Sequence, residues 1–155
     1  MADFEPLRNP VHLRFDHQRT YPTLGGIPRL LVDFRSVDRS ARNVLGGQAS
    51  VLVIVDSGAD VTMLPWRFAA PLRVPLDDLP RATIRGAGGA GVPCSGKIRL
   101  EAQLCGRWVE LPVRFFTEDV RTDALLGREG AFDALHLAFA HSRQLMYAAP
   151  AEPVT

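Results

Sequence analysis

The sequence predicts a single all-β domain. Apolar and polar residues alternate with a period of two in several separate runs, which is the pattern of strands with one buried face. Twelve prolines and thirteen glycines divide the 155 residues into short segments, as turns do in an all-β domain. The chain has the length of one domain and 46% hydrophobic residues, so it is long enough to bury a core.

The alternating runs define the expected strands in chain order. They cover residues 11–15, 30–35, 97–104, 109–115 and 135–139. Pro112 lies within the fourth run and, because proline has no backbone N–H, it indicates an edge strand or a bulge there. Cys105-Gly106-Arg107 separates two of the runs and predicts a hairpin turn.

Residues 51–55 form a run of a different kind, with five consecutive apolar residues that are mostly β-branched. Such a run predicts a strand that is buried on both faces. A short helix is expected to begin near Arg128 and to run through Phe132. Residues 38–49 are predicted to form a mobile connection, and residues 1–10 and 148–155 are predicted to be flexible tails.

The composition argues against several classes of function. A net charge of +1 gives no strong field to attract nucleic acid or an acidic membrane surface. Cys94 and Cys105 have no partners at metal-ligand spacing, so no metal site is expected, and reduced thiols are favoured over a disulfide. The first residues contain no signal-peptide core and no apolar run reaches transmembrane length, so we expect a cytoplasmic protein.

The tripeptide Asp56-Ser57-Gly58 follows the apolar run directly. A carboxylate at the end of a buried strand loses part of its hydration. Gly58 permits a tight loop, and the Ser57 hydroxyl can donate a hydrogen bond to a neighbouring group or accept one from it. Alone, however, the tripeptide is better explained as an ordinary turn after a strand.

Two further segments change this interpretation. Residues 85–91 are rich in glycine and lie between two predicted strands, so they predict a flexible hairpin that can close over a ligand. No helix pattern and no lysine-serine/threonine pair follow it, which argues against a phosphate-binding loop. Residues 124–129 form a short apolar strand that ends in Gly127 and Arg128.

In order and spacing, these three segments resemble the retropepsin-like (retroviral-type) aspartic peptidase family. The resemblance covers residues 27–147, and the chain is most similar to the bacterial single-domain members. It implies a single domain over residues 1–155, built as an acid-protease β-barrel with one short C-terminal helix and assembled as a two-fold homodimer. It also implies a peptide or protein substrate and no cofactor.

The resemblance assigns a role to each matching residue. Asp56 would be the catalytic carboxylate, and Ser57 and Gly58 would support the active-site loop, Ser57 by bracing it against the loop of the second subunit. Asp60 would bind the substrate main chain and pair with Arg128. The full set of implied substrate-binding residues is Ala59, Asp60, Ala87, Gly88 and Gly89, and the implied structural supports are Gly127 and Arg128. The glycine-rich hairpin departs from the family because it has no aromatic residue.

The chain contains one Asp-Ser-Gly motif, whereas this type of peptide hydrolysis needs two carboxyl groups that share a proton. The second carboxyl group would therefore be Asp56 of another copy, related by a two-fold axis. The sequence thus predicts a homodimeric aspartic endopeptidase without nucleic-acid or membrane partners. A non-catalytic peptide-binding dimer of the same fold, and a protease that processes itself, remain alternatives. Ser57 lacks the G-x-S-x-G context of a serine nucleophile.

Overall fold

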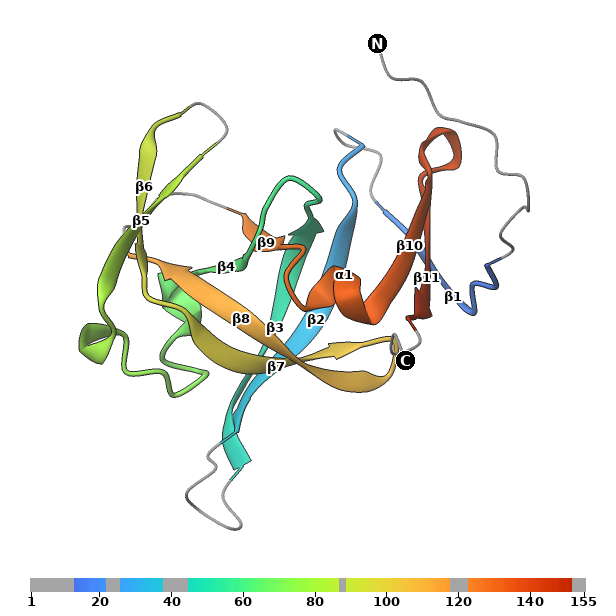
Figure 1. The fold of residues 1–155 in the computed structure, drawn as a ribbon. Helices are drawn as coiled ribbons and strands as arrows, with labels where there is room; N and C mark the ends of the chain where they lie inside the picture. The colour runs from blue at the N-terminus through green and yellow to red at the C-terminus, as the bar shows by residue number, and fades with distance from the viewer. Residues whose placement is uncertain (1–12, 22–25, 38–44, 87–88, 118–122, 152–155) are drawn as a thin grey trace.

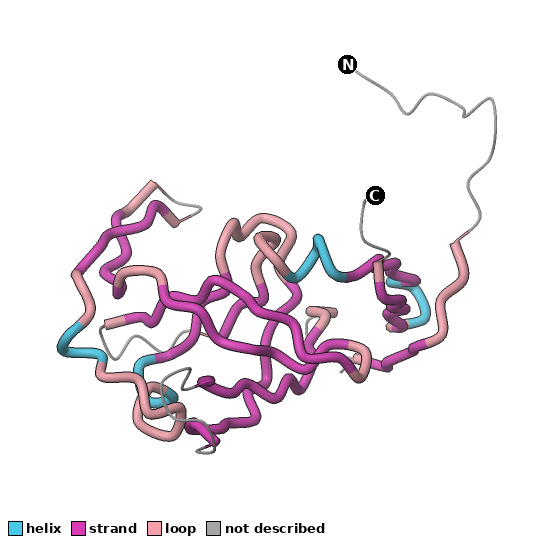
Figure 2. The backbone as a smooth tube through the Cα atoms, turned by 60° about the horizontal axis from the view of Figure 1, so that its bottom comes forward, coloured by secondary structure: helices cyan, strands magenta, loops and turns pink. Residues whose placement is uncertain are grey.

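The structure is a computed structural model. It describes residues 13–21, 26–37, 45–86, 89–117 and 123–151. Figure 1 shows a β-structure with a hairpin projecting at one end and a small sheet, formed by segments near both termini, at the other. Figure 2, turned by 60°, shows the same separation of the two ends.

Eleven strands account for most of the described residues. They are β1 (His17–Thr20), β2 (Arg29–Val37), β3 (Leu45–Val55), β4 (Thr62–Pro65), β5 (Arg81–Arg85), β6 (Gly91–Ser95), β7 (Ile98–Leu104), β8 (Arg107–Phe116), β9 (Ala124–Leu126), β10 (Leu135–Ala140) and β11 (Leu145–Pro150). The described helices are short: α1 (Ala131–Ala134) and three 3₁₀ turns at Trp66–Phe68, Leu76–Asp78 and His141–Arg143.

Six strands close into a barrel. Their order is β4-β9-β3-β2-β7-β8, and parallel pairing of β4 with β8 completes the ring. Strands β5 and β6 extend from this barrel as a hairpin, which joins β8 at Cys94 and Phe116. The predicted fold class, an all-β barrel with one short helix near the C-terminus, is confirmed. We call the β5–β6 hairpin, residues 81–95, the flap hairpin.

The barrel interior is filled by alternate residues of its strands. In β3, Val51, Val53 and Val55 are buried, whereas Leu52 is 54% exposed and pairs with Leu31 of β2, which is 66% exposed. The prediction that residues 51–55 are buried on both faces was therefore wrong. An apolar run can be read as double burial, but here the outer face of the β2–β3 pair meets solvent at these positions.

Strand β8 shows how the barrel accommodates a proline. Pro112 pairs with Arg99 of β7 without a shift in register, and the pairing of β8 with β4 begins one residue later, at Val113. Pro112 therefore lies where β8 has a partner strand on one side, so its missing N–H removes no bond to β4. The predicted hairpin turn is present, with Cys105 and Gly106 at φ 47° and 75°.

Strands near the two termini form a separate sheet in the order β1-β11-β10. The strand expected at residues 11–15 is absent from residues 13–15, and β1 begins instead at His17, where it pairs with β11. Residues 148–150 belong to β11 rather than to a tail, and residues 45–49 belong to β3 rather than to a connection. The rest of the predicted connection and tails, apart from Ala151, lies outside the described residues.

Neither cysteine forms a disulfide. Cys94, at the base of the flap hairpin, is fully buried with Met63 and Phe116, and Cys105 is half-buried in the β7–β8 turn. Burial raises the pKa of the Cys105 thiol above its usual range. In the described part of the chain, no helix is long and apolar enough to cross a membrane.

Alkylation of the native protein is expected to modify Cys105 slowly at neutral pH and to spare Cys94. The thiolate is the reactive form, so the raised pKa moves the rise in the Cys105 rate to a higher pH than that of the unfolded chain. Intact-mass measurements over time, with Cys105→Ser as the control, follow both sites. Fast labelling of Cys94 in the native protein would contradict the burial of this thiol.

Candidate active site

Asp56 lies where a central strand pair of the barrel ends. Strand β3 runs parallel to β9, with Val55 opposite Leu126. The Asp56 backbone N–H continues this pairing by donating to the Leu126 carbonyl at 3.1 Å. The position of Asp56 is therefore fixed by strand pairing rather than by a free loop.

The loop after Asp56 folds back on its own carboxylate. The Gly58 N–H donates to Asp56 Oδ1 at 2.8 Å, and the Ala59 N–H donates to the Asp56 carbonyl at 3.2 Å. A Cβ at Gly58 would lie 3.2 Å from Asp56 Oδ1, closer than ordinary van der Waals contact. Glycine at this position therefore lets the backbone approach and orient the carboxylate.

A second loop, residues 127–129, holds the Asp56 loop in place. The Gly127 N–H donates to the buried Thr62 hydroxyl at 3.2 Å, the Arg128 N–H donates to the Ala59 carbonyl at 2.9 Å, and the Glu129 N–H donates to the Asp60 carbonyl at 2.8 Å. The helix expected from Arg128 to Phe132 begins only at Ala131, since the N–H groups of Arg128 and Glu129 are bonded to the Asp56 loop. That boundary prediction was wrong.

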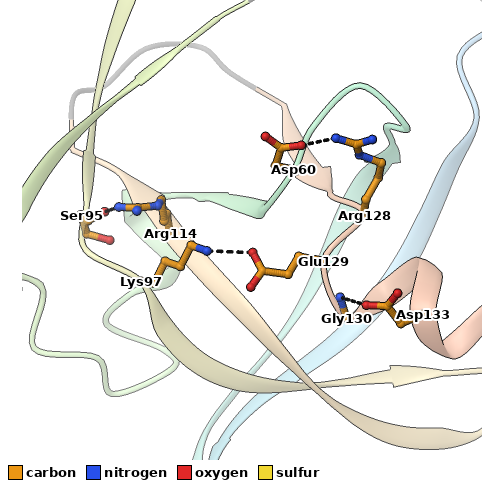
Figure 3. A network of polar contacts seen from close by, with 8 residues as sticks. All are labelled: Asp60, Ser95, Lys97, Arg114, Arg128, Glu129, Gly130 and Asp133. Carbon is orange, nitrogen blue, oxygen red and sulfur yellow. Dashed lines mark hydrogen bonds and ion pairs between the residues drawn. The ribbon is translucent and has the colours of Figure 1, made fainter. Parts of the chain in front are cut away.

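The Arg128 guanidinium also forms an ion pair with the Asp60 carboxylate (Figure 3). The two side chains are 56% and 78% exposed, so the pair contributes little to stability. Its contribution is to orient two charged groups at the edge of the site.

A cleft of about 1140 Å³ extends from the Asp56 loop to the flap hairpin. The predicted site residues on its wall are Asp56, Gly58, Ala59, Asp60 and Arg128. Its floor includes apolar side chains of the small cluster beneath the flap hairpin, among them Met63 and Leu125.

The other predicted site residues lie elsewhere. Ser57 is exposed and, among the described residues, has no hydrogen-bond partner. Gly127 is buried behind the Asp56 loop, Gly89 is exposed at the end of the flap hairpin, and Ala87 and Gly88 lie outside the described residues.

Sequence reasoning did not assign five charged residues of the cleft to the site: Arg85, Lys97, Arg114, Glu129 and Asp133. Two of them are joined by an ion pair of 2.7 Å between Lys97 and Glu129. Nothing local in the sequence marks them, because the folding of the barrel decides which polar side chains face the cleft. Across the described ranges, no group of three or more His, Cys, Asp or Glu side chains is placed to hold a metal ion.

The closed barrel, the flap hairpin and the carboxylate loop define an acid-protease fold of the retropepsin-like type. A family model described as "Aspartyl protease" matches residues 43–129, which is more than half of the chain. The chain therefore belongs to the aspartyl protease family, and the family predicted from the sequence is confirmed.

Comparison with solved structures finds one similar fold and two weaker matches. A retropepsin-like aspartic protease from Rickettsia conorii aligns with a TM-score of 0.60 and 17% identity, covering 85% of this chain and 88% of that one. The EIAV protease complexed with the inhibitor HBY-793 aligns with a TM-score of 0.44 and 19% identity, covering 70% and 88%. The retroviral protease-like domain of Ddi1 from Leishmania major gives 0.35 and 21%, covering 65% and 69%. No curated protein matches the sequence.

Proposed function

We propose that the protein is an aspartic endopeptidase that works as a homodimer, with one Asp56 carboxyl group from each subunit. The observation that carries this proposal is the Asp56 carboxylate itself, which lies on the cleft wall with a backbone amide of its own loop as its hydrogen-bond partner. The hydrogen bond orients the carboxylate, and among the described residues no cationic side chain forms an ion pair with it. A carboxylate held in this way is suited to proton transfer.

The chemistry follows from two carboxyl groups that share one proton. One carboxylate removes a proton from water as the water oxygen attacks the peptide carbonyl carbon, while the other carboxyl group donates its proton toward the carbonyl oxygen. Collapse of the tetrahedral intermediate breaks the C–N bond, and a proton passes to the leaving amine. Water is the nucleophile, so the reaction needs no cofactor.

The other carboxylates of the cleft have structural partners. Asp60 pairs with Arg128, Glu129 pairs with Lys97, and Asp133 accepts from the Gly130 N–H at 3.0 Å before α1. None of them follows a barrel strand as Asp56 does. A second copy of Asp56 is therefore the best candidate for the missing carboxyl group.

The edge of the terminal sheet supports association of two copies. Strand β10 has β11 on one side and, in the described chain, no strand on the other. Phe139 of β10 is 47% exposed. An unpaired strand edge beside an exposed aromatic side chain is a surface that pairing with a second copy would cover.

A peptide substrate would lie extended in the cleft, with strand-like hydrogen bonds to the chain around it. Ala59, Asp60 and the flap residues Ala87, Gly88 and Gly89 would contact its main chain. The Ser57 hydroxyl would brace the Asp56 loop against that of the second subunit, in keeping with its exposure.

Mixing wild-type protein with an Asp56→Asn variant tests the shared site. After complete subunit exchange, an equimolar mixture is expected to have about one quarter of the activity of wild type at the same total concentration, because only wild-type pairs carry two aspartates. Independent monomers would instead give about one half. Sedimentation at the assay concentration checks the mass. An active monomer would contradict the proposal.

A further inference from the structure

The cleft has one basic wall. The charged residues that reach it from the flap hairpin, the β6–β7 turn and β8 are Arg85, Lys97 and Arg114. The opposite wall carries the acidic residues already described together with Arg128. The two walls therefore present different charges to a bound peptide. A charged side chain can bind the peptide best where it does not already form an ion pair within the protein.

Arg114 is half-buried and, unlike Lys97 and Arg128, has no acidic partner among the described residues. Lys97 is engaged with Glu129, and Arg128 with Asp60. Arg114 donates to the Ser95 carbonyl at 2.7 Å, and among the described residues it forms no ion pair (Figure 3). A guanidinium group has five N–H donors and keeps its charge at all ordinary pH values, so the bond to Ser95 takes up only a small part of its binding capacity.

The acceptor that holds Arg114 is itself fixed. Ser95 is buried at the base of the flap hairpin, and its hydroxyl accepts from the Phe115 N–H at 2.9 Å and donates to the Gly96 carbonyl at 2.8 Å. The guanidinium is thus tied to an ordered part of the barrel, which limits the entropy lost when a ligand binds it.

Strand register sets Arg114 beside an apolar floor. Met63 of β4 pairs with Arg114 of β8 on one side and with Leu125 of β9 on the other, so the three side chains share one face. A glutamate side chain has methylene groups and a carboxylate, and it would match an apolar floor that ends in a cation. Asp56 lines the same cleft as these three residues.

From this geometry we infer that Arg114 determines specificity by binding an acidic side chain of the substrate, glutamate above all, near the scissile bond. The inference rests on the proposed peptidase function. Along the path β8-β4-β9-β3, three strand spacings of about 4.8 Å separate the strand of Arg114 from the strand that precedes Asp56. An extended peptide rises about 3.3 Å per residue, so the acidic residue of the substrate would lie within about four residues of the scissile bond. In a two-fold dimer, Arg114 of each subunit would favour such a residue on either side.

Matched peptide pairs that differ only by glutamate or glutamine at one position test this inference. At about pH 6, where a glutamate side chain is ionised, we expect the wild-type kcat/KM to be about tenfold higher for the glutamate peptide at the preferred positions. Arg114→Met should lower the ratio to about one, and Arg114→Lys should retain part of it. Arg107→Met, which removes an arginine of the same strand outside the cleft, should leave the ratio as in wild type.

The ratio of the two kcat/KM values distinguishes loss of glutamate recognition from loss of protein stability. Destabilisation caused by losing the bond between Arg114 and Ser95 would lower cleavage of both peptides alike. Binding of the same pair to the Asp56→Asn variant, with and without Arg114→Met, gives a second measurement that needs no cleavage. A glutamate preference in binding without any cleavage by the wild type would overturn the peptidase proposal and support Arg114 recognition. Equal binding of both peptides, or a preference that survives Arg114→Met, would overturn the role of Arg114 whether or not peptides are cleaved.

Discussion

Replacing Asp56 with asparagine is expected to lower kcat/KM for peptide cleavage by about a thousandfold or more, with the fold unchanged. Asparagine has the same shape and keeps an oxygen that accepts the Gly58 N–H, so the loop geometry is preserved. It cannot take a proton from water at the pH of the assay. The measurement is steady-state cleavage of a fluorogenic peptide library, together with thermal unfolding of both proteins.

The matched control is Asp77→Asn, which makes the same chemical change at an exposed residue outside the cleft. Its kcat/KM should stay within about twofold of wild type, as for other surface substitutions. Turnover that persists in Asp56→Asn would show that another residue carries the chemistry. A wild-type protein that binds peptides but cleaves none would favour the non-catalytic alternative.

Gly127→Ala is expected to destabilise the protein by about 3 kcal/mol or more and to remove its activity. A Cβ at this position would lie 2.4 Å from the Val61 carbonyl carbon and 2.8 Å from the Thr62 nitrogen. Both are backbone atoms, so relief requires the 127–129 loop to separate from the Asp56 loop. Urea unfolding at a fixed protein concentration measures the loss, since association would make stability depend on concentration.

Gly86→Ala provides the comparison for this substitution. A Cβ there would meet Val92 Cγ2 at 3.6 Å, which is ordinary contact, and the free energy of unfolding should change by less than about 1 kcal/mol. If Gly127→Ala were as stable as Gly86→Ala, the close packing of the two loops in the structure would be incorrect.

Much of the barrel could be predicted from the sequence, because side chains that alternate in polarity specify strands directly. The alternating runs correspond to β2, β7, β8 and β10, and glycine-rich residues 85–91 mark the end of the flap hairpin. The errors occurred where a local pattern has two readings. Residues 51–55 were interpreted as buried on both faces, and Arg128 as the start of a helix. Instead, the Arg128 N–H bonds to the Asp56 loop and the helix begins at Ala131.

The sequence by itself determined the family and pointed to Asp56 as the residue proposed to carry the chemistry, since Asp56-Ser57-Gly58 and Gly127-Arg128 are local signals with local conformational reasons. Only the tertiary structure decided which charges face the cleft and which of them are neutralised. Arg114, Met63 and Leu125 lie far apart along the chain and meet because β4 pairs with both β8 and β9. Pairing between distant strands has no signal in any single segment of the sequence. The position of Arg114 in the cleft could therefore be recognised only in the closed barrel.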